Sequence, residues 1–195
     1  PEGRIDIDPK YQSMQGAVKY TDYAINKFIK DAQQKPWFNN TLFVIVSDHC
    51  SKSAGKTDLP VNRYHIPCII YAPQLVKPAI ESRLVSQIDL APTILGLMNL
   101  NYTSRFFGYD VYNMTPGNER AFISTYQDMG YVKDGKLVIL SPQQKVQQFK
   151  PDFTTGANVQ MAGSAELINE AIAWYQGASF QYKTGRYKSV KQVKP

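Results

Sequence analysis

The chain has 195 residues, of which 43% are hydrophobic, and its formal net charge is +6. A chain of this size buries enough apolar surface for one folded domain, so we expect a single α/β domain over residues 1–182 and a basic tail over residues 183–195. No apolar run is long enough to cross a bilayer, and no signal peptide is recognisable. Since the first residue is Pro rather than Met, we expect this domain to be a fragment of a longer product.

The positive charge is concentrated at the C-terminal end. Without that end the charge balance is close to neutral, so we expect a solvated tail rather than a surface that reads nucleic acid. The basic residues concerned are Lys183, Arg186, Lys188, Lys191 and Lys194, with no acid among them.

Two elements near the N-terminus predict half of an α/β repeat. Residues 11–33 carry apolar side chains at helical spacing, and residues 35–40 break that helix. Residues 41–48 are a short β-branched and aromatic run, typical of a buried strand that is covered on both faces. This strand delivers Asp48 and His49 to its C-terminal end, the edge at which open α/β sheets bind ligands. An adjacent carboxylate and imidazole suit a divalent metal such as Zn or Mn, and the competing interpretation is an ordinary loop.

The segment after this strand contains the second of the chain's two histidines. Residues 50–64 are polar without helical pattern, and residues 66–72 form a second apolar strand. A parallel partner needs a crossover connection, usually a helix, so we predict that the second strand runs antiparallel or otherwise returns from the same edge. His65 would then lie at the same sheet edge as Asp48 and His49. Either it contacts the metal or the substrate, or it merely packs beside Pro67 or bonds a backbone carbonyl.

Three other side chains of this loop are weaker candidates. Arg63 and Lys52 are candidate contacts for an anionic substrate, and solvated surface charge is the competing interpretation for each. Cys50 is either a reactive thiol beside the metal or simply a small loop residue.

The rest of the chain predicts a small α+β region. Ser86 and Asp89 fit the acidic variant of a capping box that opens a helix over residues 88–98, so we expect Asp89 to start a helix rather than to act in catalysis. The remaining predicted elements are a turn at 106–110, a strand at 121–126, a hairpin at 131–140 around Asp134-Gly135, a strand at 146–149 and a helix at 165–180 capped by Ser164.

Four blocks of the sequence resemble a known family, and they occur in that family's order. They are Tyr20–Ile25, Val44–His49, His65–Pro73 and Ser86–Thr93. Together they resemble the C-terminal part of a sulfatase-type catalytic domain, in the lipoteichoic acid synthase-like branch of the alkaline phosphatase superfamily. The resemblance implies an α/β fold: the C-terminal part of an alkaline phosphatase-like sandwich, with a small antiparallel hairpin and a terminal helix.

The resemblance also implies a function. Such domains transfer or hydrolyse phosphate or sulfate esters, and Asp48 and His49 match the family's Asp-His metal pair. The implied cofactor is a divalent metal, Mn or Zn, with Ca or Mg as alternatives. The implied substrate is a phosphate or sulfate ester such as a lipid headgroup or a glycan, and we expect no nucleic-acid partner. Many members carry Gly after this His, whereas Cys50 stands here.

The family's nucleophile and a further metal-binding carboxylate have no counterpart upstream of Asp48. Two protein ligands rarely close a tight metal site. We therefore expect an incomplete active site that is inactive alone, with the N-terminal half of the same protein as its missing partner. Because the membrane-anchored branch holds this domain outside the cytoplasmic membrane, the resemblance implies an extracytoplasmic location.

Functions from two other classes compete with this interpretation. A catalytically dead family member would serve as a binding module for a glycan or a lipid headgroup. A cytoplasmic basic domain that binds RNA is supported only by the charge of the tail.

Overall fold

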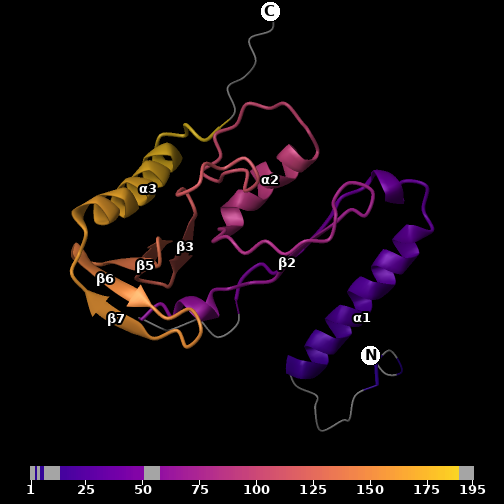
Figure 1. The fold of residues 1–195 in the computed structure, drawn as a ribbon, viewed down its shortest axis with the longest axis horizontal. Coiled ribbons are helices and arrows are strands. Elements are labelled where there is room, and N and C mark those ends of the chain that lie inside the picture. The colour runs from indigo at the N-terminus through magenta and orange to yellow at the C-terminus, as the bar shows by residue number, and fades with distance from the viewer. Residues whose placement is uncertain (1–2, 4, 7–13, 51–57, 189–195) are drawn as a thin grey trace, which may run out of the picture. The chain divides into compact units, whose positions relative to one another are not determined.

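The computed structural model describes residues 3, 5–6, 14–50 and 58–188. These residues fall into two compact units, one formed by residues 1–45 with 68–78 and the other by residues 46–67 with 79–195. Figure 1 shows the ribbon.

Helices and strands alternate over the first half of the chain, and strands dominate the second half before a last helix (Figure 1). In chain order the elements are α1 (Met14–Gln33), η2 (Phe38–Asn40), β1 (Phe43–Val46), η3 (Val61–Arg63), β2 (Cys68–Tyr71), η4 (Gln87–Asp89), α2 (Leu90–Leu97), β3 (Arg120–Ser124), β4 (Met129–Lys133), β5 (Lys136–Ser141), β6 (Lys145–Pro151), β7 (Asn158–Met161) and α3 (Ala165–Lys183), where η denotes a short 3-10 helix. The α/β class predicted from the sequence is confirmed.

The first unit is organised around an aromatic centre. Phe43 at the start of β1 is buried together with Ala32 and Phe38, and the rings of Phe38 and Phe43 lie 5.6 Å apart. Helix α1 ends shortly before Pro36, because proline disfavours helical backbone in the residue that precedes it. Ring packing therefore joins the end of α1 to the ribbon formed by β1 and β2.

The two strands of the ribbon run antiparallel, as predicted. At one end the ring of Phe43, the first residue of β1, lies 6.2 Å from that of Tyr71, the last residue of β2. At the other end the backbone N–H of Ser47 donates to the carbonyl of Pro67 at 3.4 Å. The start of one strand thus meets the end of the other, as in an antiparallel pair.

The prediction that both faces of this strand are covered is wrong for the residues described. Only Phe43 is buried in β1, and in β2 Cys68 and Ile69 are exposed. A two-stranded ribbon has two faces, and the aromatic centre covers the face that bears Phe43 and Tyr71. An apolar run in the sequence shows that a strand can be buried on both faces, but it does not show which elements cover those faces.

The second unit contains a five-stranded antiparallel sheet in the order β3-β4-β5-β6-β7, so each strand pairs with its neighbour in sequence. The predicted hairpin is confirmed as β4–β5. Asp134 and Gly135 have φ angles of 49° and 67°, as a type I′ turn requires. Strand β7 was not predicted, because exposed residues such as Val159 give it no apolar alternation that marks a buried face.

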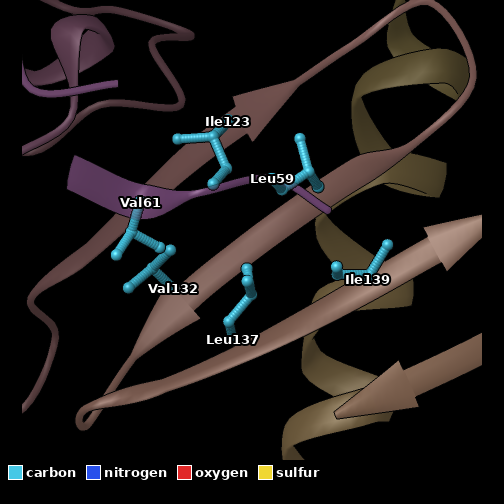
Figure 2. Close-up of a cluster of buried hydrophobic side chains, with 6 residues drawn as sticks. All are labelled: Leu59, Val61, Ile123, Val132, Leu137 and Ile139. Atoms are coloured by element: carbon cyan, nitrogen blue, oxygen red, sulfur yellow. The ribbon is translucent and has the colours of Figure 1, made fainter. Parts of the chain in front are cut away.

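Both faces of this sheet carry buried side chains. One face holds the cluster in Figure 2, made of Leu59, Val61, Ile123, Val132, Leu137 and Ile139. The other face packs on α3 through Tyr131, Val138, Leu167 and Ala171. Alternation along β4 and β5 sends successive side chains to opposite faces, so the segment around Leu59 and the helix α3 cover different sides of the sheet.

Helices α2 and α3 start near the positions predicted from the sequence. Ser86 and Asp89 form the predicted capping box, with η4 leading directly into α2. Ser164 does precede α3, but its side chain makes no capping bond; instead its backbone N–H donates to Gln148 Oε1 at 2.9 Å. The predicted basic tail is described only as far as residue 188. Among the described residues, the helices are either too short or too polar to cross a membrane.

Candidate functional site

The strand-end dipeptide Asp48-His49 adopts a compact local geometry within the second unit. The backbone N–H of His49 donates to Asp48 Oδ1 at 2.9 Å, and the Ser47 hydroxyl donates to the His49 carbonyl at 2.7 Å. Both side chains are open to solvent, His49 at 79% and Asp48 at 86% relative exposure. The backbone therefore orders the pair while leaving its functional atoms accessible.

The tautomer of His49 follows from its contact with Cys50. His49 Nδ1 lies 2.8 Å from the Cys50 carbonyl oxygen, and a carbonyl only accepts, so Nδ1 is the donor. In the neutral imidazole Nε2 then carries the lone pair. This nitrogen lies 3.5 Å from Asp48 Oδ2. Two lone-pair atoms at that separation are stabilised when a metal cation lies between them.

The separation also fits a shared metal ion. Zn ligands in a tetrahedral site, each about 2.0–2.2 Å from the ion, lie roughly 3.4 Å from one another. Asp48 Oδ2 and His49 Nε2 are therefore spaced as two ligands of one ion would be. Within the ranges that the structure describes, no three His, Cys, Asp or Glu side chains are arranged to hold a metal. The pair supplies two donors and leaves the remaining positions of an ion to other ligands.

The other predicted residues belong to the segment between β1 and β2. His65 is exposed two residues before Pro67, whose carbonyl accepts from Ser47, so it lies at the end where Asp48 follows the strand, as the antiparallel prediction requires. Arg63 is exposed at the last position of η3. Lys52 lies outside the described residues. Cys50 is half-buried, and its proposed thiol chemistry stays a prediction.

A residue that the sequence did not single out contacts this site. Gln87, in η4, donates from Nε2 to the Ser47 carbonyl at 3.1 Å and to the Asp48 carbonyl at 3.4 Å. One amide group thus binds the two carbonyls that flank the start of the dipeptide. The available signal was the capping box itself, because fixing Ser86 and Asp89 also fixes the two residues between them, of which Gln87 is the first.

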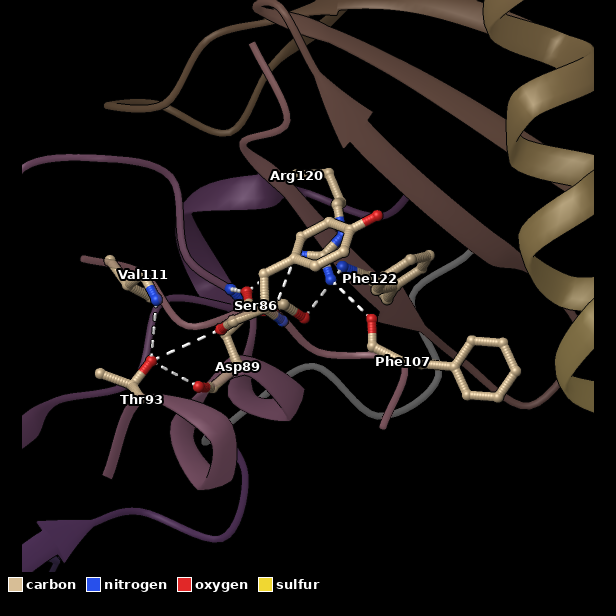
Figure 3. Close-up of polar contacts among 8 residues, drawn as sticks. Ser86, Asp89, Thr93, Phe107, Val111, Arg120 and Phe122 are labelled. Atoms are coloured by element: carbon tan, nitrogen blue, oxygen red, sulfur yellow. Dashed lines mark hydrogen bonds and ion pairs between the residues drawn. The ribbon is translucent and has the colours of Figure 1, made fainter. Parts of the chain in front are cut away.

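The η4 turn is anchored by a buried ion pair, drawn in Figure 3. Arg120 Nη1 donates to both carboxylate oxygens of Asp89, at 2.9 and 2.8 Å, and the two side chains are 2% and 0% exposed. Asp89 also accepts from the backbone N–H groups of Ser86 and Tyr109, at 2.9 and 2.8 Å. The second guanidinium nitrogen donates to the Phe107 carbonyl at 2.9 Å. Every oxygen of this carboxylate is satisfied, as a buried charge requires.

Aromatic rings enclose the cation of this pair. The Arg120 guanidinium carbon lies 4.3 Å from the ring centroid of Tyr109, 5.4 Å from that of Phe122 and 5.2 Å from that of Trp174. Cation–π attraction strengthens in a desolvated position. The expectation that Asp89 starts a helix is therefore confirmed, whereas its partner Arg120, 31 residues away, was not predicted.

Comparisons with known proteins agree with this fold. Residues 4–100, which include Asp48, His49, His65 and Gln87, match the family model described as Sulfatase. The chain is also similar to a solved structure of a protein in the alkaline phosphatase superfamily from Vibrio parahaemolyticus, at 30% identity with a TM-score of 0.90. That match covers 97% of this chain and 47% of the other.

The chain is therefore similar to the Sulfatase family model over residues 4–100 and to the fold of an alkaline phosphatase superfamily protein, and it spans less than half the length of the structure it matches. The α/β fold expected from the sequence, with an antiparallel hairpin and a terminal helix, is confirmed. The closer assignment to the lipoteichoic acid synthase-like branch stays a prediction.

Proposed function

We propose that this chain is part of a metal-dependent hydrolase or transferase that acts on phosphate or sulfate esters. Asp48 Oδ2 and His49 Nε2 hold the divalent ion, Mn or Zn, with Ca or Mg as alternatives. The observation that carries the proposal is the 3.5 Å separation of these two atoms, with Nδ1 of the same imidazole bound to the Cys50 carbonyl. A second bond that orients a metal-binding histidine is a usual feature of such sites.

Each residue of the site has a separate task. A bound divalent ion polarises a phosphoryl or sulfuryl oxygen of the ester. Asp48 contributes negative charge and His49 a neutral nitrogen to the ligand set, while Gln87 restrains the backbone between them. His65, at the same ribbon end, contacts the metal or the ester. Arg63 and Lys52, which both lie between β1 and β2 in the sequence, supply positive charge for the anionic ester group.

We propose further that the isolated chain is catalytically incomplete and that the N-terminal half of the same protein completes it. Two protein donors leave a divalent ion largely hydrated, and a covalent step needs a positioned nucleophile. In the first unit, α1 exposes Met14, Val18 and Phe28 at 59%, 64% and 57%. Apolar side chains this exposed along one helix mark a surface that a partner covers.

The substrate and the location extend the proposal. A lipid headgroup or a glycan that carries a phosphate or sulfate ester is the substrate class, and the full-length protein is membrane-anchored and extracytoplasmic. Protease accessibility on intact cells tests the location, since a cytoplasmic domain would be protected until the cells are lysed.

Calorimetric titration of the purified chain with Mn and with Zn tests the metal assignment. We expect weak binding that is lost in Asp48→Ala and in His49→Ala and kept in Asp22→Ala, which removes an exposed carboxylate from α1. No turnover of a chromogenic phosphodiester or sulfate ester is expected. Binding that survives Asp48→Ala would refute the assignment. Tight stoichiometric binding, or turnover abolished by Asp48→Ala, would show that the site is complete within these residues.

Mixing the chain with the N-terminal half of the protein distinguishes an enzyme from a binding module. Turnover that appears on mixing, and depends on Asp48, supports the enzyme. Ligand binding without turnover in the reconstituted protein would favour a catalytically dead module for a glycan or a lipid headgroup.

The role given to Gln87 has its own test. Gln87→Ala removes hydrogen bonds to two backbone carbonyls, so metal affinity should fall about fivefold, the effect of roughly 1 kcal/mol. Amide hydrogen exchange at His49 should accelerate in the absence of metal, a change that is independent of metal binding. Unchanged exchange together with unchanged affinity would remove Gln87 from the site.

A further inference from the structure

An aromatic and basic surface lies at the C-terminal end of α3, within the second unit. It is formed by residues 102–106 and 180–188, called here the α3-end surface. The two segments are joined by a hydrogen bond from the Arg105 guanidinium to the Arg186 carbonyl. Closer to the sheet, the rings of Phe107 and Trp174 lie 6.0 Å apart, so the first segment follows the helix toward its end.

Large aromatic side chains are open to solvent on this surface. Phe180 is 52% exposed, Tyr182 74% and Tyr187 51%. On the adjoining segment Tyr102 and Phe106 are 44% and 49% exposed, with their rings 6.0 Å apart. A group of exposed rings of this kind marks an interaction site rather than a set of isolated surface residues.

The charge of the surface has one sign. Residues 99–109 and 171–195 contain no Asp or Glu in the sequence. The described cations on the α3-end surface are Arg105, Lys183, Arg186 and Lys188, and all of them are exposed. Cations interleaved with aromatic rings are the composition of protein segments that lie in the headgroup region of a bilayer.

We propose that the α3-end surface docks on a bilayer that contains anionic lipids, with the aromatic rings at the headgroup level and the cations on the lipid phosphates. This goes beyond the proposed function and does not depend on Asp48 or His49. The described helices do not suit a transmembrane position, whereas an amphipathic aromatic and basic surface lies on the membrane plane.

The ring geometry favours lipid over single-stranded nucleic acid, which would bind by stacking its bases on aromatic faces. Tyr182 and Tyr187 already stack on each other, with centroids 5.7 Å apart and an interplanar angle of 14°. The Arg186 guanidinium covers the ring of Phe180 at 5.0 Å. Insertion at the membrane interface uses the edges of these rings and leaves both contacts intact.

Vesicle flotation of the 195-residue chain tests the proposal. We expect binding to vesicles of phosphatidylcholine with phosphatidylglycerol and little binding to phosphatidylcholine alone. The double variant Lys183→Gln/Lys188→Gln should weaken binding roughly 30-fold, because each cation near an anionic surface contributes about a factor of five. Tyr182→Ser/Tyr187→Ser should weaken it roughly tenfold, since it removes apolar area from the interface. Raising the salt to about 1 M should release the wild-type chain.

Matched control variants make the same kinds of substitution elsewhere on the second unit. Lys145→Gln/Lys150→Gln removes the same charge from β6, and Tyr126→Ser/Phe153→Ser removes two exposed rings. Both controls, and Asp48→Ala, should bind like the wild type. Equal losses in control and test variants would overturn the proposal, as would loss in Asp48→Ala, which would place binding at the candidate metal site.

Two other outcomes would also overturn it. Binding to single-stranded DNA that is lost in Tyr182→Ser/Tyr187→Ser, without binding to vesicles, would identify a nucleic-acid surface. A wild-type chain that sediments as a dimer, and becomes a monomer with the same substitutions, would show that a second copy covers these rings.

Discussion

Asp89 and Asp48, both in the second unit, are each paired with a cationic or ionisable side chain. The Asp89 pair is buried and the Asp48 pair is exposed. Asp89 is 0% exposed and lies 2.8 Å from Arg120, whereas the Asp48 side chain is 86% exposed and lies 3.5 Å from His49. The buried carboxylate has two backbone donors as well, and among the described residues the exposed one accepts from the backbone N–H of His49.

The difference separates stability from chemistry. A buried carboxylate with all its partners in place stabilises one arrangement of the chain and has no capacity for a ligand. An exposed carboxylate contributes little to folding but keeps coordination positions for a metal or a substrate. In this molecule the first kind of site supports the second, because η4 connects Asp89 to Gln87 and Gln87 to the strand end.

Removing the buried cation should have the largest effect. Arg120→Ala leaves Asp89 charged and desolvated, so we expect a loss of about 3–5 kcal/mol in the free energy of unfolding, measured by urea denaturation. Arg105→Ala, at an exposed position, is the control and should change stability by less than about 0.5 kcal/mol. A loss below about 1 kcal/mol in Arg120→Ala would contradict the central role given to this ion pair.

A smaller effect on stability is expected at Thr93, which bonds to the backbone of Asp89. The buried Thr93 hydroxyl donates to the Asp89 carbonyl at 2.6 Å and accepts from the Val111 N–H at 3.0 Å. Thr93→Val keeps the shape and removes both bonds, which should cost about 1–3 kcal/mol. Thr103→Val, on an exposed segment, should be nearly neutral by the same denaturation measurement. Equal stabilities would mean that the Val111 N–H finds another acceptor.

The ion pair of Glu81 with Arg83, in which the Glu81 side chain is 30% exposed, can be tested through pH. The side-chain hydrogen bonds from Arg83, at 2.8 and 2.6 Å, lower the pKa of Glu81 from 4.5 to about 2. A carboxyl whose pKa is lower in the folded state stabilises the fold above pH 4.5, and this contribution disappears as the pH falls toward 2. Glu81→Gln should therefore be slightly less stable than wild type near neutral pH, and the difference should vanish in acid. A difference independent of pH would point to lost packing instead.

The smallest effect on folding is expected at the candidate site itself. Because the side chain of Asp48 is exposed, Asp48→Ala should change the free energy of unfolding by less than about 0.5 kcal/mol. The variant should nevertheless lose any rise in melting temperature that Mn or Zn gives the wild-type chain. A large loss of stability without metal would show that Asp48 belongs with Asp89 as a structural residue.

The fold follows from the sequence wherever the signal is local. The end of α1 before Pro36, the capping box of Ser86 and Asp89, and the Asp134-Gly135 turn each depend on backbone preferences of a few adjacent residues. The antiparallel return of β2 followed from the length and composition of its connection. Strand β7 was not predicted, because its pairing within the sheet decides it. The capping bond expected from the Ser164 side chain is absent, and the Ser164 backbone N–H bonds to Gln148 instead.

For the candidate site, the sequence by itself determined that Asp48 and His49 are adjacent at a strand end. It also determined that His65 begins the return from the same end. Only the tertiary structure decided that Gln87, 40 residues from Ser47, bonds this dipeptide, and that Arg120 neutralises Asp89 from another strand. The reason is physical: residue type and spacing fix local backbone geometry, whereas contacts between distant segments depend on how whole elements pack.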